Sequence, residues 1–199
     1  MDSVLIIYSI LSFLILFSLA IISYKLNLVD LPNERKIHTK ATAYTGGIAL
    51  SIIYIFAIQL FQINGKDLNL ILSMAFLIAI LGFIDDKYNL NVGGKLSLQI
   101  IPILYLIVYE NMGLAHIGDY DWFKLSLGTF SIPFTLLSVL FLINSFNYFD
   151  GVDGLLGALS ISVLIILFFL VSDENIKLFI KILIIPIFIF LFFNFSIFK

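Results

Sequence analysis

Several residue types that often carry chemistry are scarce in this chain of 199 residues: it has no cysteine, four prolines, two histidines and one tryptophan. Without cysteine the chain can form neither disulfides nor thiolate metal sites, and cysteine catalysis is excluded. Charged side chains make up only 12% of the sequence, against roughly 25% in soluble domains. The net charge of −2 gives no indication of nucleic-acid binding, and no nucleic-acid partner is expected. The scarcity of charge therefore argues against a soluble globular domain.

The chain is instead rich in hydrocarbon. Hydrophobic residues make up 61% of it, 21 residues are phenylalanine, and the mean hydropathy is +1.13. This composition is typical of an integral membrane protein. The first apolar run follows Met1-Asp2-Ser3 with no basic segment before it and no small-residue cleavage pattern after it. We therefore expect a retained helix rather than a signal peptide.

Uncharged runs long enough to cross a hydrocarbon core of about 30 Å define the expected architecture. We expect an all-α, polytopic transmembrane helix bundle of about seven helices that forms one integral membrane domain over residues 1–199. The predicted spans lie near 4–24, 46–63, 68–84, 96–110, 130–149, 154–172 and 177–197. Spans 96–110 and 177–197 are the weakest, and each admits a tilted, kinked or re-entrant helix.

Lysine and arginine are unevenly distributed between the connecting segments, and this orients the bundle. Most of them fall on one side, and four lysines fall on the other: Lys66, Lys124, Lys177 and Lys181. By the positive-inside rule the amino terminus lies outside the plasma (inner) membrane and the carboxy terminus is cytoplasmic. The polar segments near 25–45, 85–95 and 147–153 are then all cytoplasmic and form a candidate active site. Trp122, in the longest external segment, suits an interfacial anchor.

The first polar segment carries cationic side chains, Arg35, Lys36 and His38. Arginine offers a planar fork for phosphate oxygens and lysine a mobile charge, so the segment is a candidate for holding an anionic head group. The simpler alternative is a cytoplasmic anchor on anionic lipid, with His38 as a surface residue. Gly46-Gly47 follow, and close packing between helices explains them at least as well as the approach of a ligand.

The second polar segment begins with Asp85 and Asp86 at the end of the third predicted span. Adjacent carboxylates repel each other, which favours a bound Mg²⁺ or another cation as relief. One aspartate of such a pair can accept a proton while the other holds metal or orients a donor. The alternative is that both simply mark the end of a helix in water.

The third polar segment places amides and carboxylates three residues apart, at Asn144, Asn147, Asp150 and Asp153. Neighbours in such a series share one stripe if the segment is helical. A carboxylate at mid-bilayer costs on the order of 3 kcal/mol, so the cluster is expected only at a membrane surface or a wet cavity. Gly151 and the glycines after it leave room for a substrate or break the helix. A purely structural role, with asparagines bonding between helices, leaves both aspartates unexplained.

Together the three segments resemble the polyprenyl-phosphate N-acetylhexosamine-1-phosphate transferases, a family of membrane enzymes. The resemblance rests on Asp-Leu-Pro-Asn-Glu-Arg-Lys-Ile-His followed by Gly46-Gly47, on Gly-Phe-Ile-Asp-Asp, and on Asn-Ser-Phe-Asn-Tyr-Phe-Asp-Gly-Val-Asp-Gly-Leu-Leu-Gly. These occur in the family's order and spacing from about Asp30 to Gly157. They are closer to the N-acetylglucosamine branch than to the phospho-N-acetylmuramoyl-pentapeptide branch. Ala41 and Ala43 stand where the family usually has prolines.

The resemblance implies a reaction at the cytoplasmic membrane face, the first membrane step of cell-surface glycan synthesis. The phosphate of a polyprenyl (undecaprenyl) phosphate attacks the sugar-bearing phosphorus of a UDP-N-acetylhexosamine and UMP is released, with Mg²⁺, or alternatively Mn²⁺, as cofactor. Such phosphoryl transfer requires a positioned nucleophile and neutralised oxygen charges. The implied partners are the lipid carrier, the UDP-sugar and membrane lipids, and the resemblance is compatible with a homodimer.

Carried over by motif, Asp85 is expected to act as the general base toward the lipid phosphate, with Asp86 beside it supporting charge or metal. The expected metal ligands within the chain are Asp86 and Asp150. The remaining expected site residues bind substrate: Arg35, Lys36, His38, Asn144, Asn147, Asp150, Gly151 and Asp153.

The resemblance also implies further segments beyond Lys199: a Gly-Asp loop with the family's metal-binding aspartate, more helices and a His-rich loop. We therefore expect this chain to be a truncated form or fragment with roughly the amino-terminal two thirds of the transferase fold. Two other hypotheses remain open. One is a catalytically inactive remnant, and the other is a transporter or channel subunit whose aspartates line a polar path. The transporter hypothesis predicts acids through the membrane depth and an inverted repeat.

Overall fold

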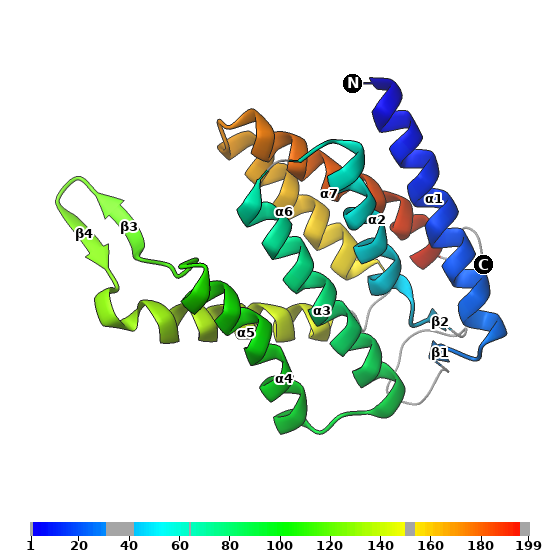
Figure 1. Cartoon of the computed structure of the whole chain (residues 1–199), viewed down its shortest axis with the longest axis horizontal. Coiled ribbons are helices and arrows are strands. Elements are labelled where there is room, and N and C mark those ends of the chain that lie inside the picture. The colour runs from blue at the N-terminus through cyan, green and yellow to red at the C-terminus, as the bar shows by residue number, and fades with distance from the viewer. Residues whose placement is uncertain (1, 31–41, 64, 150–153, 196–199) are drawn as a thin grey trace.

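The computed structural model of the chain describes residues 2–30, 42–63, 65–149 and 154–195 (Figure 1). Seven α-helices account for most of these residues: α1 Asp2–Lys25, α2 Gly46–Leu60, α3 Lys66–Tyr88, α4 Val92–Leu104, α5 Ser131–Phe149, α6 Leu155–Leu170 and α7 Glu174–Asn194. Two short antiparallel ladders accompany them. The first pairs β1 Val29–Asp30 with β2 Thr42–Ala43, and the second pairs β3 His116–Tyr120 with β4 Phe123–Ser126.

The helices confirm an all-α, polytopic membrane architecture. Five helical segments are long and apolar enough to cross a membrane: Ser3–Lys25, Lys66–Tyr88, Val92–Tyr109, Gly128–Phe149 and Glu174–Asn194. The helices α2 and α6 are apolar but shorter, with 15 and 16 residues. At about 1.5 Å per residue they fall short of a hydrocarbon core of about 30 Å. Each α-helix coincides with one of the seven predicted spans. Long apolar runs form helices because a chain in lipid must satisfy its backbone hydrogen bonds internally.

The fourth span differs most from its prediction. Its helix begins at Val92 rather than near residue 96, because the side chain of Asn91 accepts a hydrogen bond from the Gly94 amide at 2.7 Å and caps it. Further along, Pro102 has no amide hydrogen to donate, and the α-helix passes into a π-helical turn, η1, at Tyr105–Tyr109. Segment 85–95, expected as a loop, therefore consists mostly of the end of α3 and the start of α4.

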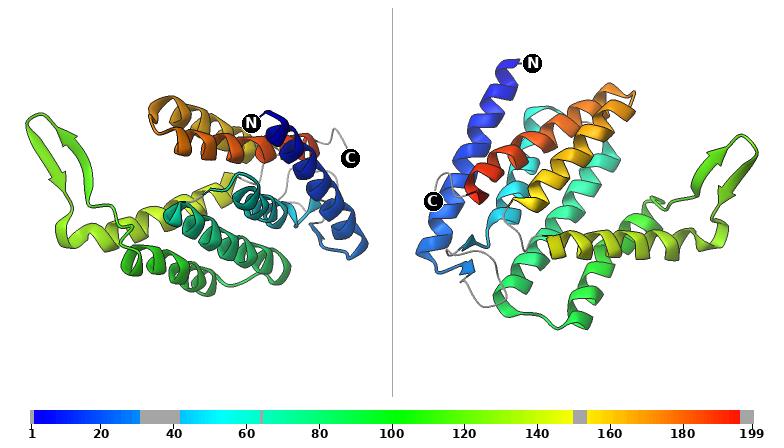
Figure 2. Two further views of the ribbon diagram at one scale, coloured as in Figure 1. Left: turned by 45° about the horizontal axis from the view of Figure 1, so that its top comes forward. Right: turned by 180° about the vertical axis from the view of Figure 1, so that it is seen from behind.

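The long connection between α4 and α5 also has more order than the sequence suggested. Residues 116–126 form the β3–β4 hairpin, with Asp121 and Trp122 in its turn. A 3₁₀ turn, η2 at Gly128–Phe130, leads from the hairpin into α5. The hairpin stands away from the helices in each view of the structure (Figures 1 and 2).

The helices pack in two groups joined through α3. In the first group α1, α2 and α7 enclose a buried cluster that includes Leu16, Ile53 and Ile182, and α6 lies along α7. The hydroxyl of buried Tyr8 donates to the Ile182 carbonyl at 3.1 Å and links α1 to α7. In the second group α4 and α5 share a smaller cluster with Ile103, Ile107 and Leu140 at its centre.

Two adjacent glycines at the start of α2 have different surroundings. A Cβ added to Gly46 would lie 2.8 Å from a ring carbon of Phe190 on α7, whereas nothing lies within 4 Å of one added to Gly47. The Phe190 ring is itself packed against the first buried cluster, so it has little room to move. Close helix packing, the simpler explanation for the glycine pair, is therefore confirmed at Gly46.

Gly46→Ala is expected to lower the free energy of unfolding by about 1–3 kcal/mol, because the new methyl group overpacks the α2–α7 contact. Gly47→Ala is the matched control and should be neutral or slightly stabilising, since a helix with alanine is more stable than one with glycine by roughly 0.5–1 kcal/mol. Thermal unfolding of both variants in detergent, followed by circular dichroism, measures the difference. Equal unfolding temperatures would contradict the packing assigned to Gly46.

Candidate active site

A tight turn between α3 and α4 positions the centre of the site. Asn89 adopts a left-handed conformation with φ of 50°, which asparagine tolerates better than most residues, and its amide donates to the Asp85 carbonyl at 2.7 Å. Two residues later Asn91 caps α4. Because the chain reverses over so few residues, Asp85 in the last turn of α3 comes to face Lys95 in the first turn of α4.

Lys95 joins three helices. Its ammonium lies 2.6 Å from a carboxylate oxygen of Asp85 and donates a hydrogen bond to Oδ1 of Asn147 on α5 at 3.3 Å. The Asp85 and Lys95 side chains are only 17% and 18% exposed, so the ion pair is screened from water far more than a surface pair is. The carboxylate, the ammonium and the amide form what we call the Lys95 cluster.

A second polar contact lies one turn further along α4. Gln99 is 5% exposed, and its side-chain oxygen accepts a hydrogen bond from Nδ2 of Asn144 at 3.1 Å. The same Asn144 nitrogen donates to the Leu140 carbonyl at 2.8 Å. A buried amide is costly unless it is hydrogen-bonded, so the pair fixes how α5 is set against α4. Asn147, the hydrogen-bond partner of Lys95, lies about one turn further along α5.

Asp86 differs from its neighbour in environment. It is exposed, whereas the Asp85 side chain is only 17% exposed, and successive residues of a helix point about 100° apart. Asp85, Asp86 and Asn147 all offer the oxygen donors that Mg²⁺ prefers. Within the part of the chain that the structure describes, however, no three His, Cys, Asp or Glu side chains form a metal-binding group. The described residues therefore fit a magnesium ion by donor chemistry but would supply only part of its ligands.

Several predicted site residues lie outside the described residues: Arg35, Lys36, His38, Asp150, Gly151 and Asp153. The elements on either side of them are described. The ladder of β1 and β2 borders the first segment, and it lies at the same end of the bundle as the carboxyl end of α3 (Figures 1 and 2). Phe149 and Gly154 border the second segment, and Phe149 is two residues from Asn147 in the Lys95 cluster.

The start of α6 is held by the end of α7. Gly154 has φ of +78°, and its amide donates a hydrogen bond to the side-chain oxygen of Asn194. A Cβ on Gly154 would clash with the ring of Phe195, so the ring rests directly on the glycine backbone. Both the backbone conformation and the close contact require glycine here. The predicted break in the helix at the third polar segment is therefore confirmed at Gly154.

Sequence reasoning identified part of this site and missed part. It named Asp85, Asn144 and Asn147, which the structure brings to the same helix ends. It gave no role to Lys95 and did not single out Gln99 or the contact made by Asn194. A signal for the first two was present, because Lys95 and Gln99 are four residues apart and so share one face of an otherwise apolar helix.

The fold and site define a multi-pass membrane protein with a polar cluster at converging helix ends. Residues 68–198 match the family model described as glycosyl transferase family 4. The chain is 32% identical over 148 residues to the undecaprenyl-phosphate alpha-N-acetylglucosaminyl 1-phosphate transferase of Escherichia coli O157:H7. It is 31% identical over 155 residues to the enzyme of the same name from Yersinia pestis. The chain belongs to glycosyl transferase family 4.

The matches cover 74% of this chain but only 40% and 42% of those two relatives. The chain thus spans well under half the length of the curated relatives it matches. The region that matches the family model, residues 68–198, includes Asp85, Lys95 and Asn147.

Lys95→Met is expected to destabilise the junction of α3, α4 and α5 by about 1.5–3 kcal/mol, because it removes the charged donor from a shielded carboxylate. Lys87→Met is the matched control, since Lys87 lies in the last turn of α3 and its side chain is exposed. Unfolding of each variant by titration with sodium dodecyl sulfate measures the change. If the two variants lose the same stability, the Lys95 cluster does not hold the three helices together.

Proposed function

We propose that this chain carries the acceptor side of a transferase that moves N-acetylglucosamine 1-phosphate, or a related N-acetylhexosamine 1-phosphate, from a UDP-sugar to a polyprenyl phosphate. The Lys95 cluster, lying inside the family match, is the observation that carries the proposal. The relatives' names state the acceptor and the transferred group. We place the site at the cytoplasmic face of the bacterial inner membrane, as the first membrane step of glycan synthesis.

In the proposed reaction an oxygen of the lipid phosphate forms a bond to the sugar-bearing phosphorus, and the bond from that phosphorus to UMP breaks. Asp85 accepts the proton of the lipid phosphate and orients it as the nucleophile. Lys95 supplies a cation beside it, and an ammonium with three donors can serve Asp85, Asn147 and a phosphoryl oxygen together. A phosphate held there is neutralised while it stays in line for attack.

The remaining predicted residues complete the proposed pocket. Asn147 and the acids after it, Asp150 and Asp153, face the nucleotide and its diphosphate. Arg35, Lys36 and His38 bind phosphate oxygens from the neighbouring segment, where cationic and planar donors suit that role. Mg²⁺, or Mn²⁺, held by Asp86 and Asp150, would neutralise charge on the diphosphate when bound. This assignment agrees with the exposure of Asp86.

A catalytically inactive remnant of such an enzyme is the second candidate, because no three His, Cys, Asp or Glu side chains among the described residues form a metal-binding group. The transporter hypothesis has less support. It requires acids spread through the membrane depth, whereas Asp85 and Asp86 lie together in the last turn of α3, and residues 68–198 belong to a transferase family.

Asp85→Asn is expected to reduce product formation by roughly 10²–10⁴-fold, the usual contribution of a positioned general base. The assay supplies membranes containing the chain with radiolabelled UDP-N-acetylglucosamine, polyprenyl phosphate and Mg²⁺, and measures labelled lipid. Asp119→Asn is the matched control, because Asp119 is also paired with a lysine, Lys124 at 3.0 Å, but lies in the β3–β4 hairpin.

The same assay separates the two candidates. It is repeated on a chimera in which the carboxy-terminal remainder of the Escherichia coli relative follows this chain. Product from the chain alone supports an active enzyme, and product from the chimera alone supports a fragment with a competent acceptor side. No product from either one, with both present in the membrane, would overturn the transferase proposal.

A further inference from the structure

The β3–β4 hairpin carries large side chains that the protein leaves uncovered. Trp122, the only tryptophan in the chain, is 93% exposed in the turn, and Tyr120 and Phe123 beside it are 54% and 57% exposed. The hairpin projects from the bundle at the ends of α4 and α5 that are remote from Lys95 and Asn147 (Figures 1 and 2). Concentrated exposed aromatic surface on a projecting element indicates a binding surface.

The strand register separates the hairpin into two unlike faces. Residues directly opposite each other in an antiparallel pair point to the same side, and sides alternate along each strand. Tyr120 pairs with Phe123 and Gly118 with Leu125, so these four residues share one face. We call it the apolar face. The Tyr120 and Phe123 rings stack with centroids 4.9 Å apart.

Gly118 lets the apolar face lie flat. A Cβ at this position would come within 2.6 Å of the Tyr120 ring, so the ring leans over the glycine backbone. Leu125, opposite Gly118, is 44% exposed and extends the apolar area beyond the stacked rings. Aromatic side chains lying over a strand glycine stabilise a hairpin and also present a broad ring surface outward.

The opposite face carries an ion pair near the turn. Asp119 pairs with Lys124, and their charged groups lie 3.0 Å apart with side chains 66% and 72% exposed. An ion pair this exposed contributes little to stability. Its consequence is that, near the turn, the face with Asp119 and Lys124 is more polar than the face with Tyr120 and Phe123.

The base of the hairpin is fixed to α5. The Leu127 amide donates to the Ala115 carbonyl at 2.9 Å and extends the ladder. The Ser131 hydroxyl donates to the Leu114 carbonyl, and the Leu114 amide donates to the Thr135 hydroxyl, both at 2.8 Å. These bonds tie both strands to the first turns of α5, so the orientation of the hairpin follows that of the helix.

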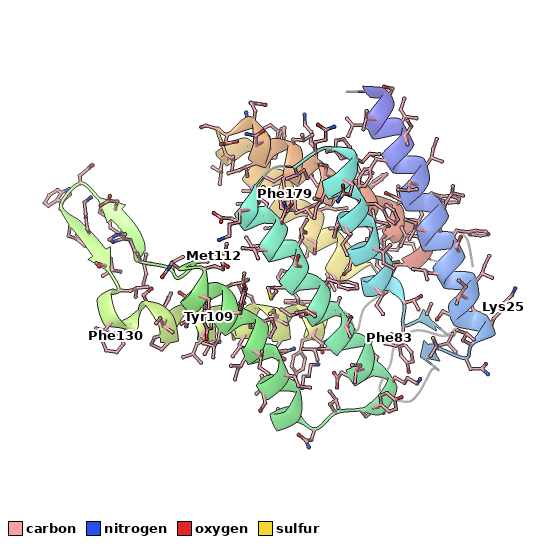
Figure 3. All side chains as sticks on the ribbon, viewed as in Figure 1. Lys25, Phe83, Tyr109, Met112, Phe130 and Phe179 are labelled. Atoms are coloured by element: carbon pink, nitrogen blue, oxygen red, sulfur yellow. The ribbon has the colours of Figure 1, made fainter. Side chains whose placement is uncertain are left out.

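An exposed apolar stripe runs from this base along α5. Phe130, Phe134, Leu137 and Phe141 follow at helical spacing and are 71%, 39%, 66% and 72% exposed. Figure 3 shows Phe130 where the hairpin joins α5. A groove of about 400 Å³ lined by Leu127, Phe130 and Pro133, with neighbouring side chains, connects the stripe to the hairpin base. In a membrane-spanning helix such a stripe contacts lipid.

We infer that the β3–β4 hairpin is an interfacial membrane anchor, with its apolar face and Trp122 set at the boundary between lipid head groups and acyl chains. Its continuity with the lipid-facing stripe of α5 identifies lipid as the occupant. The composition agrees, because tryptophan and tyrosine are enriched at this depth, where the ring is apolar and its polar atom remains hydrated. The inference does not depend on the proposed transferase activity.

Trp122 makes the test direct, because the chain has no other tryptophan. The chain is reconstituted in phosphatidylcholine vesicles, with acyl chains unlabelled or brominated near either the carbonyl or the methyl end. Bromine near the carbonyl end is expected to cause a roughly two-fold or greater loss of fluorescence, as fits an interfacial tryptophan. Bromine near the methyl end should quench less, and aqueous acrylamide should quench far less than it quenches free tryptophan.

A pair of matched variants tests which face meets the lipid. Tyr120→Ser with Phe123→Ser removes the apolar face and should raise acrylamide quenching while lowering quenching by brominated lipid. Asp119→Ser with Lys124→Ser changes the same number of residues on the opposite face and should leave both values unchanged. Equal effects from the two variants would overturn the assignment of faces.

Three results with the unaltered chain would overturn the anchor itself. Strong acrylamide quenching without lipid quenching would place Trp122 in water. Stronger quenching by the methyl-end label would place the hairpin within the hydrocarbon core. Protection from acrylamide and from both brominated lipids would show that protein, such as a second copy of the chain, covers the hairpin.

Discussion

The geometry of the candidate site depends on the ion pair and the hydrogen bond that the Lys95 ammonium makes. A charged group at the edge of an apolar bundle is costly unless opposite charge and hydrogen-bond acceptors meet it. Asp85 supplies the charge from α3 and Asn147 an acceptor from α5, so one side chain on α4 fixes three helix ends. The Gln99–Asn144 pair repeats the connection one turn away. Because α5 is held in this way, Asn147 near its carboxyl end lies against the ammonium that also pairs with Asp85.

The α4–α5 pair has chemically different ends. At one end lie the Lys95 cluster and the residues bordering the acidic segment. At the other end α4 continues into the π-helical turn η1, the chain forms the β3–β4 hairpin, and η2 leads into α5. If the hairpin rests at the lipid boundary, it limits how far this pair can tilt or slide along the membrane normal. Such a constraint would keep the Lys95 cluster at a constant depth relative to a lipid-borne phosphate.

Much of this molecule could be read from local patterns. Uncharged runs located the seven α-helices that the structure describes, and the amides and acids at three-residue steps pointed to Asn144 and Asn147. The partners of those residues were less visible. Asp85 was expected to act as the general base toward the lipid phosphate, and the structure adds a partner that the sequence did not indicate: a lysine ten residues later, brought back by the left-handed Asn89 and the capping Asn91. The sequence did not predict the hairpin, because its strands are only five and four residues long and lie between two membrane spans. In this segment the sequence indicated only Trp122 as an interfacial residue.

The sequence by itself determined that this is a membrane protein of helices whose polar segments resemble those of one family of enzymes. Those conclusions depend on composition, run length and motif spacing, which are properties of the chain before it folds. Tertiary structure decided which polar groups meet: Lys95 with Asp85 and Asn147, Gln99 with Asn144, and the Gly154 amide with Asn194. Such pairings depend on turn conformation and helix packing, and a shift of one residue in either would point a side chain in a different direction around its helix.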